Sequence, residues 1–165
     1  MPALTMIRRI VGRRLRQVCR FAGIDSRRRA LLVEAGWWLL LARLALMTVP
    51  FSRIAPRLGR FVPPDEGRLR GFPLAPPAGP SELARDVGWA VTLAARHVPF
   101  KAVCLPQAMA AKAMLGRRGV VSVLSFGVAR TPRDGLEAHA WLAAAGVEVT
   151  GFAAAESFTE IGCFV

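Results

Sequence analysis

Several residue types and motifs are scarce or missing in this 165-residue sequence. It contains no tyrosine and only two histidines, and its three cysteines, Cys19, Cys104 and Cys163, lie far apart. Without CxxC or HExxH spacing we expect neither a disulfide framework nor a metal site, and the unpaired cysteines favour a reducing cytoplasm. A phosphate-binding glycine loop and usefully spaced carboxylate pairs are also missing, which argues against nucleotide-driven and glycosidase chemistry and predicts no cofactor.

No apolar stretch is long enough for a membrane span, which needs about 20 residues. The main apolar run, Ala35 to Met47, is interrupted by Arg43 and preceded by Glu34, so only eight residues separate the two charges. We therefore predict that this run belongs to a nearly buried core helix, which begins at a capping Asp25 or Ser26.

Acidic residues are few, and the charge balance is strongly basic. The chain carries 23 lysines and arginines against 11 acidic residues, a formal net charge of +12. Such a charge attracts acidic peptides, anionic lipids or nucleic acids without choosing among them. The four tryptophans form no basic and aromatic repeat of the kind that stacks on bases, so we expect no nucleic-acid partner.

Arginines are concentrated at the amino-terminal end. Six of them between residues 7 and 21 alternate with apolar residues at three- and four-residue steps, which predicts a basic amphipathic helix within residues 1–27. The recurring arginines exclude a secretory signal. Such a helix suits contact with a membrane surface or with an acidic peptide, and the alternative is an ordinary solvated face.

The predicted elements place helices first and strands last. The long helix ends before Pro50, and in the proline-rich residues 60–80 we expect a linker or strap without regular structure. A helix capped by Ser81 follows. Residues 156–165 are predicted as an edge strand or a frayed tail. Before them, three segments are predicted as strands: 120–129, 137–142 and 147–152. This order predicts an α+β fold with a small antiparallel sheet.

The stretch around Cys104 carries the main chemical signal. Pro106 is tolerated only in the first turn of a helix, and the residues from Gln107 to Leu115 are good helix formers, so Cys104 is predicted at the start of a helix. The unpaired N–H groups and the positive dipole end favour thiolate over thiol there. Cys104 is therefore a candidate nucleophile, and the alternative is a small buried structural cysteine. Three nearby basic residues add positive charge: Arg96, His97 and Lys101.

A second informative stretch lies 35 residues beyond Cys104, where Glu137 to Leu142 alternates as a strand does. Gly146 suits a hairpin turn into residues 147–152. A helix-borne cysteine followed by a strand-borne histidine is the chain order of papain-like and transglutaminase-like enzymes, so His139 is the candidate base. The alternative is a histidine packed on a half-buried strand.

Four blocks of the sequence resemble the transglutaminase-like leader peptidases of lasso-peptide biosynthesis: Arg28–Ala35, Cys104–Ala108, Met114–Gly119 and Ala138–Leu142. The resemblance implies a cysteine protease domain over residues 28–165 that removes the leader from a ribosomally made precursor peptide. A separate ATP-using cyclase then joins the new amino terminus to an acidic side chain. Since about 27 residues precede the shared region, the resemblance also implies that a separate protein recognises the leader.

The resemblance assigns roles to individual residues. It matches Cys104 to the family nucleophile and His139 to its base. N–H groups at the start of the helix then bind the oxyanion, and the Gln107 amide is a further candidate for that role. The alternative for Gln107 is a solvent-facing helix residue.

The third residue of the family triad, an acidic side chain on the strand after the histidine, has no clear counterpart. A three-residue turn pairs His139 with Gly151, which has no side chain. A two-residue turn places Glu148 opposite Ala143, roughly 13 Å along the strand from His139. The substitutes that we consider are Thr150, a backbone carbonyl, Glu156 and Asp134.

Three functions of different classes therefore stay open. The first is the leader peptidase. The second is a non-catalytic scaffold of the same maturation complex, which binds the leader without cleaving it. The third, supported only by the net charge, is a basic protein that binds membranes or nucleic acid.

Overall fold

The computed structural model describes residues 25–76, 78–131 and 135–165. The basic helix predicted within residues 1–27 lies outside these ranges, except for its last three positions. The chain divides into two compact units, Met1–Ala30 and Leu31–Val165, and the sheet belongs wholly to the second unit.

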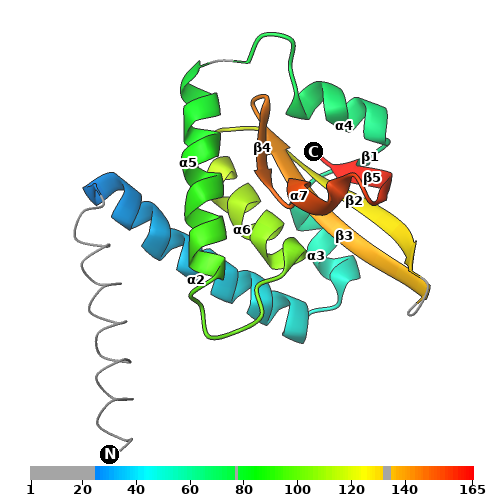
Figure 1. Cartoon of the computed structure of the whole chain (residues 1–165), viewed down its shortest axis with the longest axis horizontal. Coiled ribbons are helices and arrows are strands. Elements are labelled where there is room, and N and C mark those ends of the chain that lie inside the picture. The colour runs from blue at the N-terminus through cyan, green and yellow to red at the C-terminus, as the bar shows by residue number, and fades with distance from the viewer. Residues whose placement is uncertain (1–24, 77, 132–134) are drawn as a thin grey trace, which may run out of the picture. The chain divides into compact units, whose positions relative to one another are not determined.

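The described chain has an α+β fold, as predicted, with its long helices ahead of its long strands (Figure 1). Its helices are α2 (Ser26–Thr48), α3 (Phe51–Leu58), α4 (Pro64–Gly71), α5 (Ala78–Ala95), α6 (Cys104–Gly116) and α7 (Phe152–Ala155). Its strands are β1 (Phe61–Val62), β2 (Ser122–Thr131), β3 (Gly135–Ala144), β4 (Val147–Thr150) and β5 (Thr159–Phe164). They form one antiparallel sheet in the order β1-β5-β2-β3-β4.

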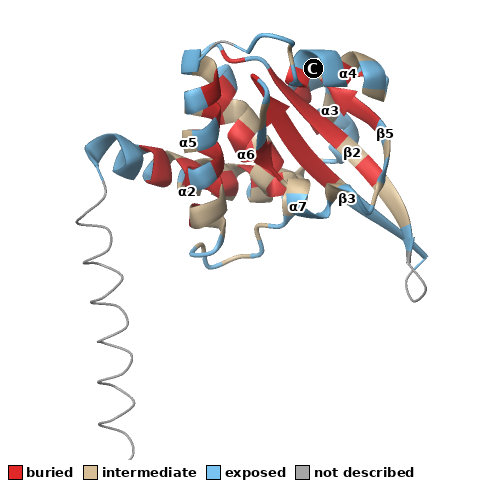
Figure 2. Cartoon of the chain, turned by 45° about the horizontal axis from the view of Figure 1, so that its top comes forward, coloured by how far each residue is buried: buried red, intermediate tan, exposed pale blue. Residues whose placement is uncertain are grey.

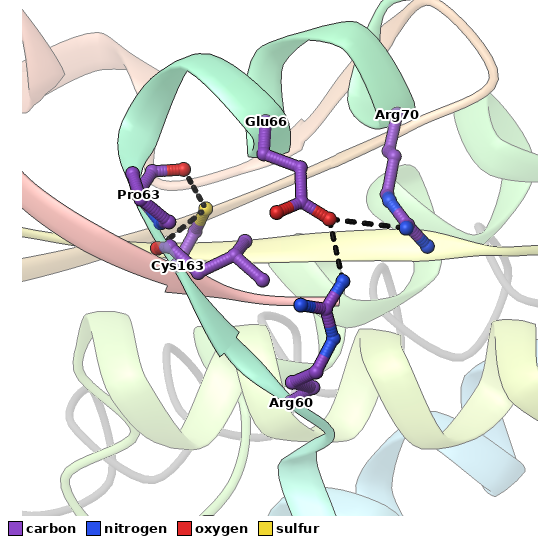
Figure 3. Close-up of polar contacts among 6 residues, drawn as sticks. Arg60, Pro63, Glu66, Arg70 and Cys163 are labelled. Carbon is purple, nitrogen blue, oxygen red and sulfur yellow. Dashed lines mark hydrogen bonds and ion pairs between the residues drawn. The ribbon is translucent and has the colours of Figure 1, made fainter.

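Helices cover both faces of the sheet, with α4 on one side and α6 on the other (Figure 3). Gly71 of α4 packs against Ala143, so the odd-numbered residues of β3 point toward α4. The even-numbered residues of the second half of β3 point to the side of α6 and are at most 2% exposed: Ala140, Leu142 and Ala144. The main core therefore lies between the sheet and α6, where Figure 2 shows buried residues on both layers.

A two-residue turn connects β3 to β4. Ala145 and Gly146 form it, and both have positive φ angles, of 49° and 77°. Ala143 consequently pairs with Glu148. The predicted register with a two-residue turn is confirmed, and the alternative register with a three-residue turn is wrong. Glu148 lies well away from His139 along the strand.

The proline-rich residues 60–80 contain regular structure, contrary to the prediction. They include β1 and α4, and α5 already begins at Ala78. Pro64 occupies the start of α4, where no backbone N–H is needed, and Asp65 and Glu66 complement the positive end of the helix dipole. The prediction failed because prolines disrupt a helix only beyond its first turn.

Ser81 does not cap α5, which is a second correction. It lies inside the helix, and its hydroxyl donates a 2.6 Å hydrogen bond to the carbonyl of Ala145. Ser81 therefore attaches α5 to the β3–β4 turn.

The last strand is neither an edge strand nor a frayed tail. β5 lies inside the sheet, because β1 pairs with its outer side through Phe61 and Val62. Cys163 of β5 is fully buried, and its thiol donates to the carbonyl of Pro63 at 3.5 Å (Figure 3). Since β1 comes from the opposite half of the chain, the local sequence did not reveal this partner.

Helix α2 begins and ends as predicted, but it is not nearly buried. Its buried residues occupy one side only: Leu31, Leu32, Ala35, Leu39 and Ala42. Large apolar residues on another side are 47–76% exposed: Val33, Trp37, Leu44 and Met47. By length and composition, α2 is the one described helix that could cross a membrane, and 22% of its most apolar window is buried.

Candidate active site

Cys104 is the first residue of α6 and follows the extended residue Val103. Gln107 donates its backbone N–H to the carbonyl of Val103, and Pro106 has no N–H. The helix therefore supplies no acceptor for the N–H groups of Cys104 and Leu105. The thiol is half-buried and free of any disulfide. Local sequence positions it, because the proline limits how far the helix extends before residue 106.

Gln107 is half-buried one turn into α6. Its side-chain Nε2 donates a 2.7 Å hydrogen bond to the carbonyl of Ala102. This bond attaches the segment before Cys104 to the first turn of the helix. Gln107 is therefore bonded to the backbone and only partly solvent-facing, and a contribution to an oxyanion site stays a prediction.

His139 lies on β3, opposite Gly127 of β2. Its imidazole stacks against two aromatic rings, Trp141 at a centroid distance of 6.0 Å and Phe158 at 4.9 Å. A side chain at position 127 would collide with both of these residues, since an added Cβ comes within 2.9 Å of their atoms. Gly127 therefore leaves the space in which the stack forms.

The His139 Nε2 atom lies 2.7 Å from the carbonyl oxygen of Gly151. A carbonyl only accepts hydrogen bonds, so Nε2 carries the proton in the neutral imidazole. Nδ1 is then the nitrogen with the free lone pair. The carbonyl thus holds the ring in one tautomer, as a carboxylate does in a catalytic triad.

Gly151 itself has a left-handed backbone, with φ of 82°. A Cβ added there would lie 2.5 Å from the carbonyl oxygen of Ala140 and 3.0 Å from Cα of Trp141. An acidic side chain at this position would require the backbone to move. Gly151 therefore has a structural reason to be glycine, and its carbonyl faces the imidazole.

Among the described residues, the other substitutes for the acidic residue make no hydrogen bond to the imidazole. The Thr150 hydroxyl is buried without a hydrogen-bond partner among the described residues. Glu156 is exposed. Asp134 lies outside the described residues. Of the substitutes considered from the sequence, the backbone carbonyl is the one that contacts His139.

No hydrogen bond joins Cys104 to His139 among residues 25–76, 78–131 and 135–165. Alternation along β3 places His139 on the side of Ala143 and α4, whereas α6 covers the other side (Figure 3). Pairing of β4 ends at Thr150, opposite Leu142, so the edge of β3 near His139 is not covered by β4. Figures 1 and 2 both place the beginning of α6 near α7 at this edge. The structure thus does not bring the Cys104 thiol and the His139 imidazole into contact, and a contact between them requires an approach around this edge.

A cavity of about 790 Å³ lies on the α4 side of the sheet. Trp141 and Phe158, the rings that stack on His139, line it together with Phe72 and Phe152. The cavity is mostly apolar and borders the two rings that stack on the imidazole. No group of three or more metal-ligating side chains gathers anywhere in the described part of the chain.

A model of the transglutaminase-like superfamily matches residues 45–163. The chain belongs to this superfamily. The match includes Cys104, His139 and Gly151, and it is consistent with cysteine-hydrolase chemistry. No curated protein and no solved structure matches the chain. The matched range begins later than the domain of residues 28–165 that the resemblance implies, and it ends two residues before the end of that domain.

Sequence reasoning missed most of what surrounds His139 in this transglutaminase-like chain. Phe158 belongs to a segment with no pattern that links it to residue 139. Gly127 carried a usable signal, because a glycine inside a strand often marks a close approach of another group. An unspecified backbone carbonyl was one of several open alternatives, and in the structure the carbonyl of Gly151 contacts His139.

Proposed function

We propose that this chain is a cysteine peptidase that removes the leader from a ribosomally made lasso-peptide precursor. The observation that carries the proposal is the 2.7 Å contact between His139 Nε2 and the Gly151 carbonyl. It supports a base role because it leaves Nδ1 able to accept a proton. The place of Cys104 at the start of α6 supports the role of nucleophile.

In the acylation step, His139 Nδ1 takes the proton of the Cys104 thiol, and the sulfur attacks the carbonyl carbon at the end of the leader. The carbonyl oxygen becomes an oxyanion, which the N–H groups of Cys104 and Leu105 bind. The C–N bond then breaks. The imidazolium gives its proton to the departing amine of the core peptide, and the leader stays on the sulfur as a thioester.

In the second step, water attacks the thioester carbonyl and His139 accepts one of its protons. The C–S bond breaks, the proton returns to sulfur, and the leader leaves with a carboxyl terminus. The Gly151 carbonyl supports the imidazolium in both steps through a hydrogen bond from Nε2. Because a neutral carbonyl stabilises a cation less than a carboxylate does, we expect a slower enzyme than a full triad provides.

The apolar cavity beside His139 is the proposed site for a leader side chain near the scissile bond. Its aromatic lining favours an apolar residue at that position. The proposed partners are the precursor peptide, a separate leader-recognition protein and an ATP-using cyclase, acting in the cytoplasm.

The decisive experiment is mass spectrometry of a candidate precursor incubated with the chain and its recognition protein. We expect cleavage at one bond, with a loss of at least about a hundredfold in Cys104→Ala and in His139→Ala. Cys163→Ala is the matched control, since Cys163 is a fully buried thiol on β5 that donates to the carbonyl of Pro63 and not to His139. Cleavage that survives Cys104→Ala would refute the proposed nucleophile.

A non-catalytic leader-binding scaffold is the second candidate function. Two observations on the described residues favour it: no acidic side chain bonds to His139, and the Cys104 thiol makes no hydrogen bond to the imidazole. Binding of a fluorescent leader peptide distinguishes the two candidates. Full binding with no cleavage in the same samples would establish the scaffold instead of the peptidase.

A further inference from the structure

The outer side of α2 is an exposed apolar surface, which we call the α2 outer face. Its large residues are 76%, 59%, 47% and 67% exposed in the order Val33, Trp37, Leu44 and Met47. At 100° per residue these four lie within one third of the helix circumference. Solitary exposed apolar side chains are ordinary, but a contiguous row on one helix marks a contact surface.

An open apolar cavity of about 680 Å³ borders α2 and extends the apolar area. Trp38, Leu41 and Ala45 line it from α2, and Met109 lines it from α6. Arg57 of α3 also lines it and is exposed. The cavity thus combines apolar walls with a cationic group that an anionic headgroup can contact.

The charge of the chain indicates which kind of partner binds this face. The net charge is +12, and nine arginines against one acidic residue precede Leu31 in the sequence. An apolar helical face next to a strongly basic segment is the pattern that binds anionic lipid surfaces, because apolar burial and attraction to headgroups act together. A tryptophan on the face suits the boundary between headgroups and acyl chains.

The buried side of α2 decides how the helix can meet a bilayer. Leu39 and Ala35 are fully buried in the folded chain, and Glu34 forms a 2.6 Å ion pair with Arg118. A helix that crossed the bilayer would have to give up these contacts or take them into hydrocarbon. Only the outer face is available, so the one orientation that keeps these contacts has the helix in the plane of the interface.

We propose that the α2 outer face docks this protein on an anionic phospholipid bilayer, with Val33, Trp37, Leu44 and Met47 inserted at the boundary between headgroups and acyl chains. This inference goes beyond the proposed peptidase and does not depend on it, because its readout is lipid binding and not cleavage.

The test is sedimentation with vesicles of phosphatidylcholine alone or mixed with phosphatidylglycerol. The full chain is expected to bind the mixed vesicles, more weakly as salt rises, and to bind neutral vesicles poorly. The double variant Trp37→Asn/Met47→Gln should bind the mixed vesicles at least about tenfold more weakly, because it removes two inserted apolar side chains. These residues are exposed, so circular dichroism of the variant should match the parent chain.

The matched control replaces two apolar residues with similar exposure elsewhere, Leu69→Asn/Leu136→Asn, at 75% and 72%. This control should bind as the parent does. Equal binding by the Trp37→Asn/Met47→Gln variant would overturn the proposal, since the basic segment alone would then carry the attraction. Resistance to alkaline carbonate extraction would also overturn it in favour of a membrane span. A dimer that the same variant abolishes would overturn it in favour of self-association.

Discussion

The imidazole of His139 is held by groups that contribute no charge. One carbonyl defines its tautomer, and two aromatic rings restrict its orientation. The Trp141 and Phe158 planes lie within 26° of the imidazole plane, so rotation about the side-chain torsions would break both stacks. The Gly151 carbonyl and the aromatic packing thus orient the imidazole, which is the task of the carboxylate in a catalytic triad.

The tautomer is directly measurable. In nitrogen-15 correlation spectra at a pH where the ring is neutral, His139 is expected as the Nε2–H form, because Gly151 offers only an acceptor to that nitrogen. The chain has two histidines, so the spectrum of a His97→Gln variant assigns the signal. A predominant Nδ1–H form would contradict the proposed base whether or not the chain cleaves peptides.

Replacing Gly151 by aspartate should not restore a triad. We expect Gly151→Asp to lower the free energy of unfolding by about 3 kcal/mol, from the left-handed backbone together with the collision with Ala140. Gly119→Asp is the matched control, because Gly119 has φ of 71° with no atom near its Cβ position. It should cost about 1 kcal/mol. Equal losses in urea unfolding would show that the backbone near Gly151 relaxes easily.

Helix α6 connects the reactive residue to the rest of the fold at both of its ends. At its start, Gln107 bonds to the carbonyl of Ala102, and at its end Arg118 reaches Glu34 of α2. The Arg118 guanidinium makes two bonds to the Glu34 carboxylate, of 2.6 and 3.1 Å. This hydrogen-bonded pair lowers the pKa of Glu34 below its ordinary value, although partial burial opposes the shift.

Removing the Glu34 charge should loosen the attachment of α2. Glu34→Gln is expected to lower stability by about 1 kcal/mol near neutral pH. Because the folded pKa is lowered, the ion pair stabilises the fold above the ordinary value of 4.5, and this contribution is lost as pH falls through the folded pKa. Denaturant unfolding at neutral and acidic pH measures the difference, with the exposed Glu82→Gln as control. A difference that does not shrink in acid would rule out this cause.

On the scale of the whole molecule, Lys112 connects α6 to β2, which follows it in sequence, and to β5 at the far end of the chain. Its ammonium donates to the carbonyl of Ser122 at 2.7 Å and to that of Phe164 at 3.3 Å. Burial of the charge lowers the pKa of Lys112 to about 8. Burial acts in the opposite direction on the neighbouring Cys163 thiol, whose pKa is raised.

These shifts predict a measurable dependence of stability on pH. Between about 8 and the ordinary lysine value of 10.5, the unfolded chain holds a proton that folded Lys112 has lost, so this residue makes the fold more stable as pH rises. The Cys163 thiol acts in the other direction above its ordinary value of 9.0, because folding opposes its ionisation. Lys112→Met isolates the lysine contribution.

The stability of the parent chain relative to Lys112→Met should increase by on the order of 2 kcal/mol between pH 8 and pH 10.5. The other lysine of the chain, Lys101, is exposed and provides the control: Lys101→Met should leave the dependence of stability on pH unchanged. Parallel profiles for the parent and Lys112→Met would show that the ammonium is solvated.

The elements that carry the candidate site were predictable because short-range rules govern them. A proline in the first turn places Cys104 at the start of α6, and alternation places His139 on β3. The hairpin was limited to two registers by its turn, and the structure has the second. The composition and the net charge of +12 likewise follow from the sequence alone.

Tertiary structure decided what depends on partners distant in the chain. β5 lies inside the sheet because two residues of β1 pair with it, and α2 keeps an exposed face because neighbouring elements cover only one side. The bulge in β4 and the left-handed Gly151 bring a carbonyl to His139, and Phe158 adds its ring from another segment. Local propensity carries no information about such contacts, because their stability comes from packing between segments that meet only in the folded chain.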